Sequence, residues 1–336
     1  MILRLRFDPT CKSKLLSRKQ LTGCVMIICC GEALIDMVPE TLANGESSYV
    51  PRSGGAVFNT AVAMGRLGIE CALVSGISND LFGEQLVQGL EHSNVATDHL
   101  MRSDLPTTLA FVKLVNGHAS YAFYDENTAG RMLTRADAVT LPKECHALYF
   151  GGISLATLPC QEFYLETLAQ NSEGRVVMID PNIRPAFIAD EMQYRSVLTD
   201  AFERVDIVKV SDEDLDWIDQ SDASLEEKAR ALLGRGPSVV IITRGGDGAL
   251  IYLKGADAPV TVAAQKVTVA DTVGAGDSFN AGFLANLEDS DLLTPEKIAN
   301  LSSEQAREAA QFAASVAAIT VTRQGANPPW RDELTA

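Results

Sequence analysis

The chain has 336 residues, of which 46% are hydrophobic and 21% are charged, and its formal net charge is -16. This length and composition are typical of a globular protein with one large domain or two ordinary ones. The negative charge argues against a general nucleic-acid or membrane-surface binder, and no apolar run approaches the ~20 residues of a membrane span.

The first 25 residues differ from the rest of the chain. They hold six basic residues and one acid, and this charge of +5 leaves -21 for the remainder. They lack the continuous apolar stretch and the small-residue cleavage site of a secretory signal. We therefore expect residues 1–25 to be a disordered extension, followed by one domain over residues 26–336.

From Met26 onward, short apolar, β-rich runs alternate with stretches of helical spacing. This pattern predicts a doubly wound α/β domain, in which a mostly parallel sheet carries helices on both faces. The expected strands are 26–30, 71–77, 147–153, 175–180, 206–211, 239–243, 248–253 and 259–269. The most regular helical stretches are 57–68, 82–94, 278–287 and 302–322.

Two segments break this alternation. Residues 107–124 contain two strand-like runs around Asn116-Gly117, which is a strong hairpin signal. Residues 37–52 are loop-rich with a few strand formers. Neither segment has room for a helix, so we expect the two together to form a small antiparallel flap beside the main sheet.

The seven cysteines and four histidines show no metal-binding pattern. The cysteines are scattered and never spaced as CxxC, and the histidines do not form HExxH. We interpret the cysteines as reduced thiols of a cytoplasmic protein.

A glycine cluster, DTVGAGDSFNAG, occupies residues 271–282 between an expected strand and an expected helix. A helix that begins near Asp277 would expose the unpaired N–H groups of its first turn, and with the helix dipole these attract anions. The cluster is neither a Walker A loop nor a GxGxxG loop. Taken alone, it is equally compatible with a tight turn in which Asp277 is an ordinary N-cap.

Three other segments carry comparable features. Gly54-Gly55 precede a helix with Asn59 on its first turn, and Asp36 follows the first strand on the side where ligands of open α/β sheets bind. TRGGDGA, residues 243–249, is a second glycine turn after a strand and suits a nucleotide phosphate. Each has an alternative as a turn or cap, but the four together favour a ligand site.

These segments resemble the ribokinase-like (PfkB) family of carbohydrate kinases from about Met26 to Trp330. The most specific motifs are SGGAVFNTAVAMGRLG and, later in the chain, DTVGAGDSFNAGF; VVIITRGGDGAL and AASVAAITVTRQGANPPW support them. GEALIDM, FYDENTAGRML and DPNIRP are most similar to the bacterial fructokinases of the family. The resemblance implies the ribokinase-like fold and equates the expected flap, about residues 37–52 and 107–124, with the family's β-sheet lid.

The resemblance also implies a role for each matching residue. Asp277 would take the proton from the sugar hydroxyl, and the amides of Gly274, Ala275 and Gly276 would form the anion hole. The sugar would be bound by Asp36, Gly54, Gly55, Asn59, Phe123 and Arg184. ATP would be bound by Lys209, Ser211, Thr243, Gly245, Gly248 and Ala314, and Asp271 would belong to a loop that binds a monovalent cation such as K+.

One stretch departs from the family pattern. The family commonly has Asn-x-x-Glu near its Mg–phosphate site, and the aligned KVSDEDL has Ser211 and Asp214 in those places. We expect Asp214 to reach Mg2+ through water, because Mg2+ keeps several of its waters in proteins. Lys209 would help to hold phosphate or, alternatively, be a surface charge at a strand end.

The implied activity is that of an ATP-dependent sugar kinase, with fructose as the expected acceptor and fructose 6-phosphate as the product. A 2-keto-3-deoxygluconate kinase is the alternative; its acidic substrate would call for arginines, for which Arg184 and Arg131 are candidates. Ribokinase, nucleoside kinase and a non-catalytic sugar-binding protein remain further alternatives. The expected partners are the sugar, ATP with Mg2+ and, through the lid, a second copy of the chain; neither nucleic acid nor a membrane is expected.

Overall fold

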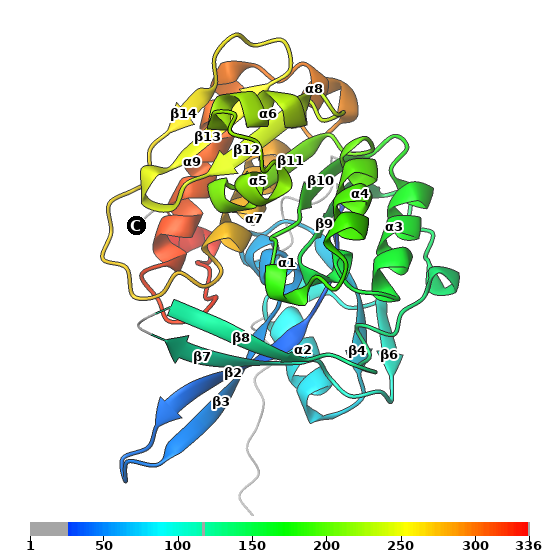
Figure 1. The fold of residues 1–336 in the computed structure, drawn as a ribbon, viewed down its shortest axis with the longest axis vertical. Helices are drawn as coiled ribbons and strands as arrows, with labels where there is room; N and C mark the ends of the chain where they lie inside the picture. The colour runs from blue at the N-terminus through cyan, green and yellow to red at the C-terminus, as the bar shows by residue number, and fades with distance from the viewer. Residues whose placement is uncertain (1–25, 116–117, 335–336) are drawn as a thin grey trace, which may run out of the picture.

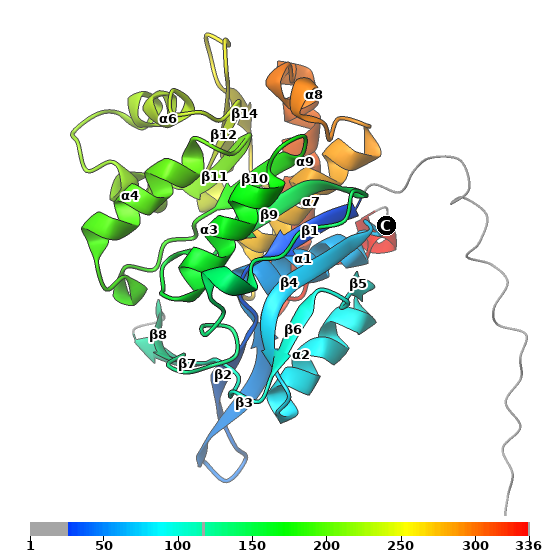
Figure 2. The same ribbon diagram turned by 90° about the vertical axis from the view of Figure 1, so that its right-hand side faces the viewer.

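In the computed structural model, which describes residues 26–115 and 118–334, ten strands form one large sheet. Their order is β14-β13-β12-β11-β10-β9-β1-β4-β5, with β6 paired to β4 (Figure 1 and Figure 2). The pairs are parallel except at one edge, where β13 and β14 are antiparallel. The strands are β1 Met26–Cys30, β4 Cys71–Ser78, β5 Val95–Ala96, β6 Leu100–Ser103, β9 Cys145–Gly151, β10 Val176–Asp180, β11 Ile207–Ser211, β12 Val239–Thr243, β13 Ala249–Leu253 and β14 Val260–Val262.

Helices cover both faces of this sheet (Figure 2). Successive residues of a strand point to opposite faces, so Ile27 and Cys29 join one apolar core while Ile28 and Cys30 join the other. The first core is closed by α1 Ala56–Arg66, α2 Leu81–His92, α7 Ala275–Asp289, α8 Pro295–Ala299 and α9 Ser303–Thr320. The second is closed by α3 Cys160–Asn171, α4 Glu191–Phe202, α5 Asp212–Ile218 and α6 Leu225–Leu233. Short 3-10 turns are η1 Arg135–Asp137, η2 Ile153–Leu155, η3 Pro185–Phe187, η4 Gly245–Asp247 and η5 Arg331–Leu334.

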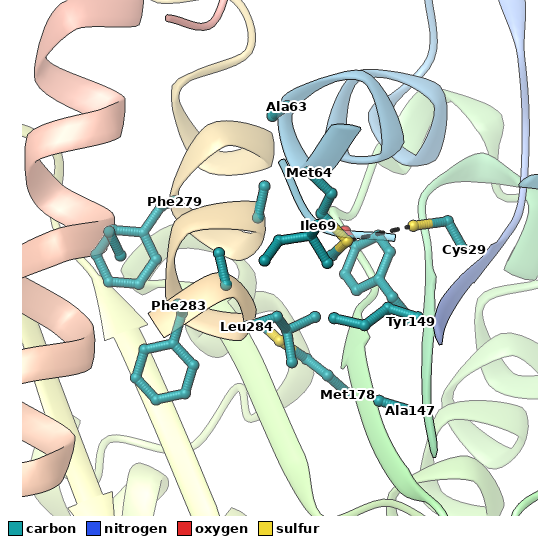
Figure 3. Packing of buried hydrophobic residues seen from close by; sticks show 14 of the residues in the cluster. Cys29, Ala63, Met64, Ile69, Ala147, Tyr149, Met178, Phe279, Phe283 and Leu284 are labelled. Carbon is teal, nitrogen blue, oxygen red and sulfur yellow. Dashed lines mark hydrogen bonds between the residues drawn. The ribbon is translucent and has the colours of Figure 1, made fainter. Parts of the chain in front are cut away.

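The first core places α7 firmly against its neighbours. Figure 3 shows Leu284 of α7, Met64 of α1 and Tyr149 of β9 in one buried cluster. On its α9 side, a Cβ added to Gly282 would lie 2.7 Å from the Cα of Ala313, so the two backbones approach closely. The middle of α7 is therefore packed against rigid elements on two sides, which fixes the direction in which its first turn points.

A second, four-stranded sheet lies beside the main one, in the order β3-β2-β7-β8. Its strands are β2 Leu34–Thr41, β3 Ser47–Gly54, β7 Leu109–Val115 and β8 His118–Tyr124. The prediction that residues 37–52 are loop-rich is wrong, because β2 and β3 pair over their full lengths as a hairpin. The flap is also not wholly antiparallel, since β2 pairs with β7 in parallel.

The predicted fold class, a doubly wound and mostly parallel α/β sheet with a small second sheet, is confirmed. The expected strand over 259–269 is too long: β14 ends at Val262, and Val267 and Val269 are exposed.

The five cysteines in the described ranges are free and buried. None of the helices described is long and apolar enough to cross a membrane. The extension predicted over residues 1–25 and the Asn116-Gly117 turn lie outside the described residues.

Candidate active site

A cavity of about 370 Å³ lies at the carboxyl ends of the parallel strands, where the N-termini of α1 and α7 and the small sheet meet. Ligands of open α/β sheets bind at this edge. Ten of the residues predicted for the site line the cavity: Asp36, Gly55, Asn59, Phe123, Arg184, Lys209, Asp271, Gly274, Gly276 and Asp277. Segments more than 200 residues apart in the sequence therefore share one cavity.

The first turn of α7 brings Asp277 into this cavity. Gly274 caps the helix with a left-handed backbone (φ 78°), and a Cβ there would lie 2.7 Å from the Cβ of Ala326. The alternative in which Asp277 is an ordinary N-cap is wrong, because Asp277 is the third residue of the helix. The N–H groups of a first helical turn have no partner within the helix, so they are available to an anion.

Asp277 is buried and hydrogen-bonded to α1. The residue is only 7% exposed, and its Oδ2 accepts a hydrogen bond of 2.9 Å from Nδ2 of Asn59. Burial raises the pKa of Asp277 from 3.8 to about 7; Asn59 opposes this rise, as do the positive charges of Lys209 and Arg184, whereas Asp180 adds to it. A carboxylate whose pKa is close to neutral is well matched to accepting a proton.

Asp36 faces the cavity from the small sheet. Asp36 follows the first strand, as predicted, and lies within β2. A Cβ on Gly54 would lie 2.1 Å from Asp36 Oδ2, and one on Gly55, whose φ is 103°, would lie 2.9 Å from the carbonyl oxygen of Glu32. Gly54, the last residue of β3, thus lets the chain pass close to Asp36, and Gly55 lets it pass close to the backbone of Glu32. Burial raises the pKa of Asp36 to about 6.

Lys209 forms a buried ion pair in the same cavity. Its Nζ lies 2.8 Å from Asp180 Oδ2, and the two side chains are 6% and 2% exposed. The alternative in which Lys209 is a surface charge is therefore wrong. Asn280 of α7 donates to the same carboxylate oxygen at 2.8 Å.

Sequence reasoning missed three polar residues at this site: the half-buried Glu32 and the buried Asp180 and Asn280. Glu32 follows β1, and its carboxylate accepts the N–H of Ala56 at 2.9 Å and that of Ser154 at 3.4 Å. Glu32 and Asp180 could have been found, because each is an acid at the carboxyl end of an apolar strand run. Asn280 gives no such signal, since it stands among small residues within a helix.

Two further glycine-motif residues are not among those that line the cavity. Gly54 precedes the lining residue Gly55, and Ala275 stands between Gly274 and Gly276. The N–H of Ala275 donates to the carbonyl of Thr272 at 3.3 Å. In this structure the amide of Ala275 therefore belongs to the turn before α7.

Most of the residues predicted to bind ATP lie further along the same sheet edge. Ser211 and Thr243 are paired at the ends of β11 and β12, and Gly245 and Gly248 follow in the next turn. A Cβ on Gly248 would lie 2.1 Å from the carbonyl oxygen of Val262, so packing alone demands glycine there. Ala314 is in α9 and packs against the first core. Of the predicted ATP residues, only Lys209 lines the cavity.

The two residues predicted to contact metal ions are held by backbone N–H groups. Asp214 forms a capping box with Ser211, and its other oxygen accepts the N–H of Ile183 at 3.1 Å. Asp271 joins two segments by accepting the N–H of Val273 at 3.1 Å and that of Gly325 at 2.9 Å. Within residues 26–115 and 118–334, no group of three or more His, Cys, Asp or Glu residues is arranged to hold a metal ion.

The two arginines considered for an acidic substrate differ in position. Arg184 lines the cavity, and its guanidinium donates to the carbonyl of Ile183 at 3.1 Å. Arg131 lies outside the cavity, where it pairs with Asp125 at 2.8 Å and donates to the carbonyl of Leu158 at 3.0 Å. Only Arg184 is placed to meet a substrate.

Comparisons with known proteins agree on one family. Residues 25–333 match the family described as pfkB family carbohydrate kinase. A fructokinase of Rhizobium leguminosarum bv. trifolii is 49% identical over 283 residues, which are 84% of this chain and 86% of that protein. The structure of a fructokinase with bound ATP from Xylella fastidiosa has a TM-score of 0.83 at 27% identity and covers 92% of this chain and 97% of its own.

Several similar solved structures contain a bound sugar or riboside, including the following two. A double mutant of the fructokinase from Vibrio cholerae, with fructose, ADP and a potassium ion bound, has a TM-score of 0.80 at 26% identity (91% of this chain, 95% of that one). The aminoimidazole riboside kinase of Salmonella enterica, complexed with aminoimidazole riboside and an ATP analog, has a TM-score of 0.79 at 27% identity (92% and 98%).

Proposed function

This chain belongs to the pfkB family of carbohydrate kinases, which are phosphotransferases acting on a sugar hydroxyl, and we propose that it transfers the γ-phosphate of ATP to fructose to give fructose 6-phosphate. The 49% identity to a fructokinase supports fructose as the acceptor. The observation that carries the proposal is Asp277, a buried carboxyl with a pKa of about 7 at the N-terminus of α7.

In the proposed reaction, the acceptor hydroxyl lies between Asp277 and the γ-phosphate. As its oxygen bonds to the γ-phosphorus, the bond from that phosphorus to the bridging oxygen breaks, ADP leaves, and the hydroxyl proton passes to the Asp277 carboxylate. The unpaired N–H groups of Gly276 and Asp277 and the ammonium of Lys209 face the charge on the moving phosphoryl group. Positioning and charge stabilisation dominate such transfers.

The sugar would be held by groups that meet around Asp277. Asp36 and Asn59 offer oxygens and an amide to sugar hydroxyls, and Gly55 leaves the backbone open to close approach. Asn59 also orients the base through its hydrogen bond to Asp277. Removing one of these groups should therefore weaken the binding of the acceptor more than that of ATP.

The small sheet would act as a lid over the acceptor. Phe123 of β8 meets Phe187 of η3 edge to face, with ring centroids 4.5 Å apart, so the lid already contacts the main domain. Phe123 also lines the cavity. A lid in this place would exclude water, which otherwise competes with the sugar for the phosphoryl group.

The nucleotide would extend from this cavity along the sheet edge over Ser211, Thr243, Gly245 and Gly248 towards α9. Mg2+, bound with ATP, would offset phosphate charge. Asp214 fits only a water-mediated contact with it, because both of its oxygens already accept backbone N–H groups. The oxygens of Asp271 likewise accept backbone N–H groups, and they tie together the segments before α7 and after α9; in this place Asp271 would belong to a loop that binds K+.

A 2-keto-3-deoxygluconate kinase remains the second candidate, because the guanidinium of Arg184 lines the cavity and could bind a carboxylate. The two are separated by measuring kcat/KM with ATP and fructose, ribose, 2-keto-3-deoxygluconate, adenosine or aminoimidazole riboside. We expect the value for fructose to exceed every other by at least about tenfold, or ~1.4 kcal/mol of transition-state binding. A higher value for the keto acid would refute fructose as the acceptor and assign Arg184 to its carboxylate.

We also propose that a second copy of the chain covers the outer face of the lid. By strand register this face lies opposite to Asp36 and Phe123, and it carries an aromatic cluster of Tyr49, Phe111 and Tyr124 with centroids 5.1 and 5.4 Å apart. Tyr124 is 64% exposed and Tyr49 47%. Analytical ultracentrifugation should show a dimer that Tyr124→Glu dissociates; a monomeric wild type would refute the proposal.

A further inference from the structure

Asp180 lines the active-site cavity and takes no part in the scheme above. It ends β10, and its carboxylate accepts three hydrogen bonds from groups of the protein. Oδ1 accepts the N–H of Asn182 at 3.1 Å, while Oδ2 accepts Lys209 Nζ and Asn280 Nδ2, each at 2.8 Å. A carboxylate held from three sides has a fixed position before any ligand binds.

The ammonium that Asp180 holds lies beside the first turn of α7. A Cβ on Gly276 would lie 3.0 Å from Lys209 Nζ, so the absence of a side chain at Gly276 leaves the room in which the ammonium sits. Lys209 and Gly276 both line the cavity. The ammonium and the free N–H groups of this turn can therefore act on the same phosphoryl group, and such fixed donors are most effective where charge develops.

Other charged groups near Lys209 come from several elements. Asp214 of α5 and Asp277 of α7 face it in addition to Asp180, and the buried Tyr149 of β9 is a neutral phenol. Burial alone would lower the pKa of Lys209, but Asp180 above all raises it. Within the described part of the chain, Asp180 is the acidic group in hydrogen-bond contact with the ammonium. A lysine buried without such a partner tends to lose its proton.

We propose that Asp180 is a positioning residue for the phosphoryl transfer: it holds the Lys209 ammonium beside Gly276 and affects the reaction only through Lys209. Asn280 assists by fixing the carboxylate oxygen that Lys209 contacts. This inference rests on the proposed function, because it requires a phosphoryl group to arrive at the first turn of α7. The competing account is that Asp180 contacts a substrate directly.

A double-mutant cycle separates these accounts. We would measure kcat at saturating ATP and fructose, and KM for fructose, for the wild type, Asp180→Asn, Lys209→Met and the double variant. Lys209→Met should lower kcat on the order of 10²-fold, as removal of one fixed donor does, and Asp180→Asn at least about tenfold. The double variant should lie within about twofold of Lys209→Met, because residues that act through one group are not additive. KM for fructose should change by no more than about twofold.

Asp206→Asn is the matched control. Asp206 is a partly buried aspartate at the opposite end of the same strands, where it accepts the N–H of Val177 at 2.8 Å, and its variant should keep the wild-type kcat. If Asp180→Asn fails to fold, comparing the kcat of the double variant with that of Lys209→Met still tests the role of Asp180. The double variant should fold, because removing both charges of a buried pair leaves no unpaired charge.

The outcomes distinguish this inference from the proposed function. A double variant at least about tenfold slower than Lys209→Met would overturn the positioning role and assign Asp180 a contact with substrate. A wild type that turns over none of the five acceptors would refute the proposed function and this role with it. If the wild type is active and the free-energy effects of Asp180→Asn and Lys209→Met on kcat add in the double variant, only the positioning role of Asp180 is refuted.

Discussion

Replacing Asp277 by asparagine should change turnover and stability in opposite directions. Asparagine has nearly the shape of aspartate but cannot accept the hydroxyl proton. Removal of a general base typically lowers kcat on the order of 10²–10⁴-fold. The binding of ATP should change little, because the groups proposed to bind the phosphates are backbone amides and Lys209.

The expected stability follows from the burial of the same carboxyl. Its pKa is raised from 3.8 to about 7 in the folded protein, so the folded state disfavours the ionised form. At about 1.4 kcal/mol for each pH unit, ionised Asp277 lowers the free energy of unfolding by roughly 4 kcal/mol at most. This cost is absent below pH 3.8, grows as the pH rises and is complete above about pH 7. Asp277→Asn should therefore melt several degrees higher than the wild type at pH 8 and at the same temperature near pH 4.

The assay combines kcat from ADP release, ATP affinity from calorimetry and melting curves at pH 4, 6 and 8. Ser278→Ala is a matched control next in the helix, where the hydroxyl of Thr320 donates to that of Ser278 at 2.8 Å. It should lose stability and keep most of its kcat. An Asp277→Asn variant with near-normal turnover would refute the role of Asp277 as the base, and one that melts lower at pH 8 would refute the account of its burial.

Three other predictions concern the same cavity. The kcat/KM of the wild type for fructose should fall as the pH drops below about 7, because this constant reports the free enzyme, in which Asp277 must be ionised to accept a proton; a profile of kcat/KM against pH without this acidic limb would contradict the raised pKa. Asp36→Asn should raise KM for fructose at least about tenfold and leave KM for ATP unchanged; equal changes in both constants would remove Asp36 from the sugar site. Gly276→Ala should lower kcat more than about tenfold, because the added Cβ would crowd the Lys209 ammonium. Gly246→Ala is its control and should keep the wild-type kcat, because a Cβ there meets open space; equal kcat values for the two variants would contradict the tight fit at Gly276.

The alternation of apolar strands and helices was sufficient to predict eight of the ten strands of the main sheet; the short β5 and β6 were missed. Every predicted strand of that sheet exists, because strands buried on both faces leave a continuous apolar run in the sequence. The same pattern did not predict the strands of the small sheet whose side chains are partly exposed to water. Residues 37–52 looked loop-rich because β3 alternates exposed and half-buried positions, and its pairing with β2 depends on partners 6 to 20 residues away.

The site was predictable where glycine or helix geometry imposes the residue type. Gly274 must adopt a left-handed backbone, and Gly55 must as well, so both stand out as motifs. The ion pair of Asp180 with Lys209 was not predictable, because the two residues are 29 positions apart and meet only when β10 and β11 pair. Neither residue type nor local spacing signals such a contact.

The identity of the phosphorylated product tests the central claim most directly. Fructose labelled with 13C at C6 would be incubated with ATP and the wild-type protein, and the product examined by 13C and 31P NMR. The account predicts one equivalent of ADP for each phosphomonoester formed, with the labelled C6 resonance split by phosphorus. Release of inorganic phosphate without a sugar ester, or an ester whose labelled carbon shows no coupling to phosphorus, would contradict it.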